Sequence, residues 1–110
     1  MRTEIRARSV SLPDALRAYI RQRLWIALGR FGTAIRTVDA RLADVNGPKG
    51  GVDIVCRIET RVRGRAPLVV EALAAEPRQA VDRAVDRASR AVGRAVERRD
   101  DRPRLAWRSS

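Results

Sequence analysis

Apolar and polar residues alternate in three segments of the chain, a pattern typical of strands with one buried and one exposed face. The three segments are 2–9, 35–46 and 52–63, and a shorter segment, 66–73, is predicted as a fourth strand after the turn at Gly64-Arg65. The alternation is clearest in the third, where every second residue from Arg57 to Arg63 is charged. We therefore expect a sheet with one apolar face, and we expect Cys56 on that face as a buried structural thiol.

Two other segments carry apolar residues at spacings of three and four, which predicts amphipathic helices. The first helix begins at Ser11-Leu12-Pro13-Asp14, with Ser11 as the predicted N-cap and Pro13 in the first turn. It runs for about five turns and ends near Gly29 and Gly32. Its apolar stripe comprises Leu12, Leu16, Tyr19, Ile20, Leu24, Ala27, Leu28 and Phe31. Trp25 flanks this stripe and is expected at the edge of the core.

The second helix is predicted to begin at Glu76-Pro77, with Glu76 as its cap and Pro77 at its first position. Its expected buried stripe comprises Val81, Ala84, Val85, Ala88, Val92, Ala95 and Val96. Beyond residue 98 the chain is charged and interrupted by Pro103. We expect one domain over 1–98 and a flexible basic C-terminal tail over 99–110.

The elements follow the order β-α-β-β-β-α. The helix between the first two strands predicts that they are parallel, and the short later connections predict antiparallel neighbours. Because the exposed face of the third strand is charged, both helices must cover the other face. The predicted fold is a two-layer α+β sandwich, with a four-stranded mixed sheet and both helices on one face.

The composition of the chain favours one class of binding partner and excludes several kinds of catalytic or metal site. Lys and Arg total 24 against 13 Asp and Glu, so the net charge is +11, which favours a polyanionic partner. The chain has no histidine and one cysteine, so it offers no His-based triad, disulfide framework or CxxC zinc site. We expect no enzymatic activity, no cofactor, no metal and no small-molecule substrate. With no predicted signal peptide or membrane span, we expect a cytoplasmic protein with no membrane partner.

The strongest candidate binding residues lie on the second helix. Arg83, Arg87, Arg90 and Arg94 are spaced four, three and four residues apart, so they share one face. Arginine can grip phosphate oxygens through two donors at once. The alternative is a solvated face on which Asp82, Asp86 and Glu97 pair locally with these arginines.

Further candidates are more ambiguous. Arg17 and Arg21 on the first helix continue the same basic surface if the two helices lie side by side, or else serve solubility alone. Lys49 lies in a glycine-rich loop, which is either a phosphate-approaching loop or a plain hairpin connection. The exposed sheet face mixes arginines with acids and has no aromatic residue, so it is not a base-stacking platform. This favours recognition of RNA shape and backbone.

The order of elements and three motifs resemble one family. The motifs are Ser11-Leu12-Pro13-Asp14-Ala15-Leu16, Asp44-Val45-Asn46-Gly47-Pro48-Lys49-Gly50-Gly51 and Ala80-Val81-Asp82-Arg83-Ala84. They resemble the ribosome hibernation promoting factors, also called ribosome-associated inhibitor A or sigma-54 modulation proteins. The chain resembles the short form, which lacks the additional C-terminal domain. Many members carry a tyrosine where Arg78 stands here, and Arg78 joins the candidate rRNA-binding residues.

The resemblance implies a fold like a double-stranded-RNA-binding domain. It also implies binding to the small ribosomal subunit and its rRNA, in the path of messenger and transfer RNA, with inhibition of translation under stress. The residues leave two alternatives open. One is a generic double-stranded-RNA or ribosome-assembly binding domain, and the other is a protein–protein adaptor with a basic face.

Overall fold

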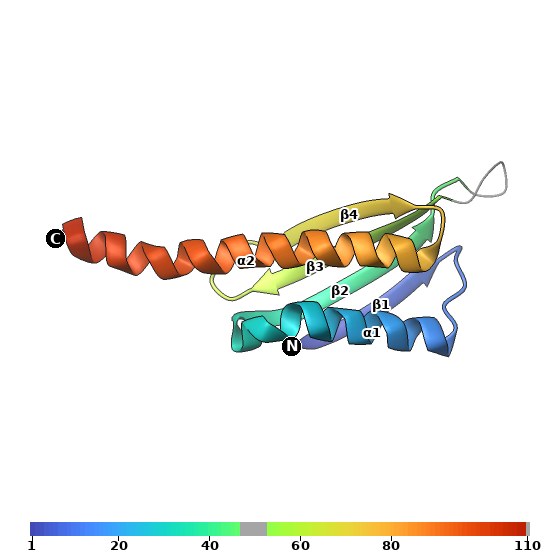
Figure 1. Ribbon diagram of the computed structural model, residues 1–110, viewed down its shortest axis with the longest axis horizontal. Helices are drawn as coiled ribbons and strands as arrows, with labels where there is room; N and C mark the ends of the chain where they lie inside the picture. The colour runs from blue at the N-terminus through green and yellow to red at the C-terminus, as the bar shows by residue number, and fades with distance from the viewer. Residues whose placement is uncertain (47–52, 110) are drawn as a thin grey trace.

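The computed structural model describes residues 1–46 and 53–109, and for residues 98–109 it describes the backbone only. The elements are β1 (Arg2–Arg8), α1 (Asp14–Leu28), the 3-10 helix η1 (Gly29–Ala34), β2 (Ile35–Asp44), β3 (Ile54–Val62), β4 (Leu68–Ala74) and α2 (Pro77–Ser109). Figure 1 shows the strands side by side, with α1 and α2 lying across one face of the sheet. The predicted α+β sandwich is confirmed.

The sheet has the order β1-β2-β3-β4, which makes β1 and β4 its two edges. β1 pairs with β2 in parallel, and the other neighbours are antiparallel, as predicted. The turn between β3 and β4 contains Gly64 with a φ of 74°, a conformation that glycine adopts without strain. Here the Arg65 N–H donates to the Val62 carbonyl over 3.2 Å.

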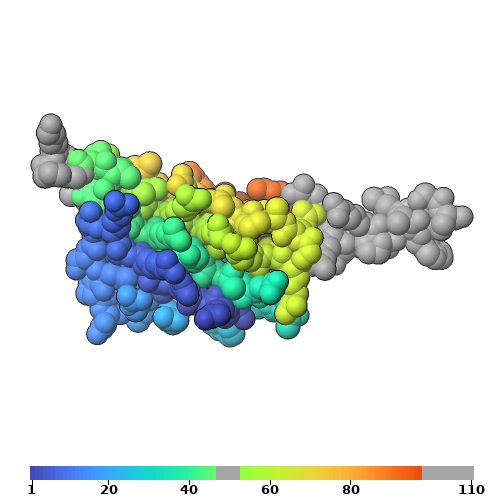
Figure 2. Space-filling model, turned by 180° about the vertical axis from the view of Figure 1, so that it is seen from behind, coloured from blue at the N-terminus to red at the C-terminus, as the bar shows by residue number. Residues whose placement is uncertain are grey.

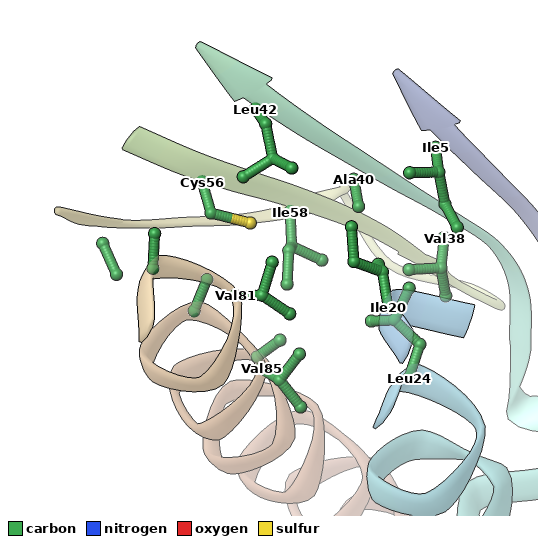
Figure 3. Packing of buried hydrophobic residues seen from close by; sticks show 14 of the residues in the cluster. Ile5, Ile20, Leu24, Val38, Ala40, Leu42, Cys56, Ile58, Val81 and Val85 are labelled. Carbon is green, nitrogen blue, oxygen red and sulfur yellow. The ribbon is translucent and has the colours of Figure 1, made fainter. Parts of the chain in front are cut away.

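The core lies between the sheet and the two helices (Figure 3). Leu24 of α1, Ile58 of β3 and Val85 of α2 are each at most 1 % exposed. The predicted stripe of α2 is buried, except that Val96 is partly exposed. Its alanines let the helix backbone approach the sheet closely. Cys56 is fully buried among these residues, which confirms its predicted place on the apolar face.

The start of α1 differs from the prediction. Pro13 is the N-cap, with no side-chain hydrogen bond, and the first helical bond runs from the Arg17 N–H to the Pro13 carbonyl over 3.0 Å. The predicted cap, Ser11, therefore lies two residues too early to reach the free amides of the first turn. α2 begins at Pro77 as predicted, with the Ala80 N–H bonded to the Glu76 carbonyl over 3.0 Å.

Both helices also end differently from the prediction. α1 stops at Leu28, and a 3-10 helix continues to Ala34 through Gly32, which has a φ of 56° and a ψ of −129°. α2 continues past residue 98 to Ser109. Pro103, at which the sequence predicted an interruption, thus lies within the helix. The flexibility of 99–110 stays a prediction. The strand ends shift by a few residues from those predicted.

Candidate nucleic-acid interface

The α2 arginine row, which we define as Arg83, Arg87, Arg90 and Arg94, lies on the side of α2 away from the core. All four side chains are exposed. At about 100° per residue they fall within an arc of about 60°, nearly opposite the buried stripe. The fold therefore places these four guanidinium groups along one outward face, as their spacing predicts.

Two members of the row also contact the sheet edge. Arg83 donates from Nη1 to the Leu73 carbonyl over 2.7 Å, and Arg87 donates from Nη1 to the Glu71 carbonyl. Both carbonyls belong to β4, which is an edge strand with no further neighbour among the described residues. A guanidinium carries five N–H donors, so each arginine keeps donors for an anion while it caps the edge.

Arg17 and Arg21 lie on the opposite flank of the helical layer. Arg17 donates from Nη1 to the Ile5 carbonyl of β1 over 3.1 Å. Arg21, one turn further along α1, is exposed on the same side. The helices do lie side by side, but β1 and β4 are opposite edges of the sheet. Arg17 and Arg21 therefore do not continue directly from the α2 arginine row. They form a second basic strip, which is separated from the α2 arginine row by the contact between α1 and α2.

An interhelical seam of Tyr19, Arg23, Asp82 and Asp86 joins α1 to α2. The Tyr19 hydroxyl donates to Asp82 Oδ1 over 2.6 Å, and Arg23 Nε donates to the same oxygen over 3.0 Å. Arg23 Nη2 also lies 3.8 Å from an oxygen of Asp86. The hydrogen bond to the Asp82 carboxylate, with a smaller effect of burial, raises the pKa of Tyr19 above its ordinary value.

The seam corrects one expectation about charge pairing. Asp82 and Asp86 were expected to pair with the arginines of their own helix if the row were only a solvated face. The structure pairs both with Arg23 of α1. Sequence reasoning did not single out Arg23. The available signal was its position four residues after Tyr19, on the side of α1 that faces a second helix. These two carboxylates are thus drawn away from the α2 arginine row.

The other predicted rRNA-binding residues, Arg78 and Lys49, lie outside the α2 arginine row. Arg78 lies over the Tyr19 ring, 4.4 Å from its centroid, which is a cation–π contact at the start of α2. Arg30 stacks in the same way on Phe31, at 4.6 Å. Lys49 falls outside the described residues. The roles of Arg78, Arg17, Arg21, Lys49 and the α2 arginine row in RNA binding all stay predictions.

The open face of the sheet, on the side of the molecule seen in Figure 2, carries charged residues that pair with one another. Glu4, Asp39 and Glu59 lie side by side across three strands. Each has an arginine two residues later on its own strand. The three ion pairs are Arg6–Glu4 at 2.5 Å, Arg41–Asp39 at 3.4 Å and Arg61–Glu59 at 3.4 Å. Hydrogen bonding and charge from Arg6 lower the pKa of Glu4. Three arginines of this face, Arg6, Arg41 and Arg61, are thus already paired with acids.

Two further residues bear on chemistry. Trp25 is 65 % exposed, so its predicted place at the edge of the core is wrong, because it lies on the outer side of α1. Burial raises the pKa of the Cys56 thiol to about 12, so the reactive thiolate is scarce at neutral pH. Among the described residues no cluster of acidic, cysteine or histidine side chains suits a metal ion. No helix within the described ranges is long and apolar enough to cross a membrane.

Comparison with known proteins identifies the family. Residues 3–100 match the family of sigma 54 modulation protein / S30EA ribosomal protein. The chain therefore belongs to this family of ribosome-associated proteins, which is not an enzyme family, and the predicted resemblance is confirmed. No curated protein sequence matches the chain.

Two solved structures share the fold. The Protein Y N-terminal domain of Thermus thermophilus has 25 % sequence identity and a TM-score of 0.70, over 86 % of this chain and 98 % of that domain. A ribosomal subunit interface protein from Coxiella burnetii has 12 % identity and a TM-score of 0.73, over 88 % of this chain and 99 % of that one. The second likeness supports the fold alone.

Proposed function

We propose that this protein is a cytoplasmic ribosome hibernation factor. It binds the small ribosomal subunit through rRNA phosphates, occludes the path of tRNA and mRNA, and so inhibits translation under stress. The observation that carries the proposal is the α2 arginine row, four exposed guanidinium groups on one helical face. Membership in a ribosome-associated family supports the ribosome as the partner.

Charge pairing favours the helical layer over the open sheet face as the rRNA-binding surface. Arg6, Arg41 and Arg61 of the sheet each have a carboxylate within 3.4 Å. A phosphate must compete with that carboxylate for the guanidinium. In contrast, the seam holds Asp82 and Asp86 toward Arg23 and away from the α2 arginine row. The mechanism is steric, since a bound folded domain excludes other ligands from the same channel.

The test compares two double charge reversals that change the net charge equally. Arg87→Glu with Arg90→Glu alters the α2 arginine row, and Arg57→Glu with Arg61→Glu alters the open sheet face. Each pair lowers the net charge from +11 by four, to +7. Long-range attraction to RNA therefore falls equally in both, and only the position of the lost contacts differs.

The affinity for small subunits, measured by co-sedimentation, should fall by well over tenfold when the two α2 arginines are reversed. It should fall by much less when the two sheet arginines are reversed. Inhibition of translation in vitro should fall in parallel. Circular dichroism and thermal melting control for folding, because Arg87 also contacts the Glu71 carbonyl. A larger loss in the sheet pair would show that the wrong face was chosen. Equal binding to any RNA duplex would favour a generic RNA-binding domain. Binding to ribosomal proteins that survives nuclease would favour an adaptor.

A further inference from the structure

Trp25 is exposed in a way that the fold does not explain. It lies on α1, one turn after Arg21 and two turns after Arg17, on the flank away from α2. An indole ring is among the costliest side chains to leave in water, yet Trp25 is 65 % exposed. The core of the domain is complete without it.

The backbone at Gly29 fixes how the ring is presented. A methyl group placed on Gly29 would lie 3.6 to 3.8 Å from ring carbons Cδ2, Cε2 and Cε3 of Trp25. Cδ2 joins the two rings and is enclosed by bonded carbons, so an atom can approach it only over the face of the indole. One face of the ring therefore lies over the chain at Gly29, and the 65 % exposure of the residue leaves most of the rest of the side chain in solvent.

The surroundings of the ring favour an anionic partner. α1 contains one acid, Asp14 in its first turn, against Arg17, Arg21 and Arg23. A basic strip that ends in an open aromatic face is the combination that proteins use for single-stranded nucleic acid, where cations follow the backbone and aromatic rings stack on bases.

The size of the patch excludes a large apolar partner. Ile26 is the other large exposed apolar residue of α1, and it lies about 100° around the helix from Trp25. A stable protein interface buries about 800 Å² on each side, whereas one aromatic side chain covers about 150–250 Å². A second copy would also bring a repelling charge of +11. One open ring face matches one base.

We propose that Trp25 is a stacking platform for an unpaired RNA base whose flanking phosphates are held by Arg21 and Arg17. This rests on the proposed function, because it takes RNA to be the partner. It adds a contact with a base to a surface otherwise expected to read only phosphates. It does not specify which base, because stacking tolerates all four.

The test uses the full chain carrying Trp107→Phe, so that Trp25 is the sole tryptophan. The probes are decaadenylate and an abasic oligonucleotide with the same number of phosphates, at low salt. Decaadenylate should quench the indole fluorescence, and the abasic strand should not. Filter binding of a labelled strand, which needs no tryptophan, should show that Trp25→Ala weakens decaadenylate binding about tenfold. Trp25→Phe should retain most of the affinity, and the matched control Ile26→Ala should change it by less than about twofold.

The outcomes separate this inference from the proposed function. If both strands bind equally and Trp25→Ala changes nothing, phosphate binding stands and base stacking is refuted. If the chain binds small subunits but neither oligonucleotide, or if Trp25→Ala weakens subunit binding without RNA quenching, the ring contacts something other than a base and the inference is refuted. If the chain binds neither subunits nor RNA, the proposed function itself fails.

Discussion

Replacing Tyr19 with phenylalanine removes one hydroxyl from the interhelical seam and leaves the ring under Arg78. The lost bond joins the hydroxyl to an ionised carboxylate over 2.6 Å. Hydrogen bonds to charged groups contribute about 1.5–3 kcal/mol when well shielded. The Asp82 side chain is 43 % exposed, so water replaces part of the bond. We expect Tyr19→Phe to lower the free energy of unfolding by about 1 kcal/mol. For a domain of this size, that loss corresponds to a decrease in Tm of about 4 °C.

Urea and thermal denaturation, followed by far-UV circular dichroism, measure this loss. The same substitution in an Asp82→Ala background should cost less than about 0.3 kcal/mol, because the acceptor is already gone. An equal cost in both backgrounds would show that the hydroxyl does not act through Asp82.

The pH dependence of the same pair of proteins gives an independent check. The folded chain raises the pKa of Tyr19, so it holds that proton more tightly than the unfolded chain. The stabilisation that the Tyr19 hydroxyl gives to the folded chain is therefore complete below a pH of about 10. It is lost as the pH rises through the pKa of Tyr19 in the folded chain. The advantage of the parent over Tyr19→Phe should therefore shrink above pH 10. Titration of Cys56 occurs in both proteins and cancels in the difference.

Three further predictions follow from the fold. Cys56, buried with a pKa raised to about 12, should react with a bulky thiol reagent at pH 8 only as fast as the protein unfolds, and fast labelling of the native state would contradict its burial. Gly32→Ala should cost about 1–3 kcal/mol because of its φ of 56°, whereas Gly29→Ala, at a φ of −59°, should be tolerated; equal melting temperatures would refute the distinction. Deleting 101–110 should leave Tm nearly unchanged, because the described core ends at Val96, and a large drop would show that the deleted residues pack on it.

The sequence predicted the facing of β1, β2 and β3 because their alternation has a period of two, which leaves each of these strands one choice of buried face. Strand direction followed from connection length, since only the first pair is joined through a helix. Helix ends were predicted less well. Ser11 has the right chemistry for a cap but stands two residues before the first helical bond, and no local pattern distinguishes it from Pro13.

In the candidate site, too, features set within one helix were predictable and features set by packing between helices were not. The α2 arginine row was predictable because its members share one helix, where spacing fixes the face. The partners of Asp82 and Asp86 were not, because the side of α1 that meets α2 depends on how both helices pack on the sheet. Trp25 was misplaced for a related reason. Its apolar character suggested burial, but its angular position on α1 puts it outside the stripe of Leu16, Ile20 and Leu24.

The most direct test of the account is the salt dependence of binding to purified small subunits. Each neutralised phosphate contributes about 0.7–0.9 to the slope of log affinity against log salt, so the α2 arginine row alone predicts a slope of about −3. Arg87→Gln with Arg90→Gln should make the slope shallower by about 1.4–1.8. The matched sheet pair, Arg57→Gln with Arg61→Gln, should leave it nearly unchanged. A slope near zero, or a slope that only the sheet pair alters, would contradict the proposal that α2 binds rRNA phosphates.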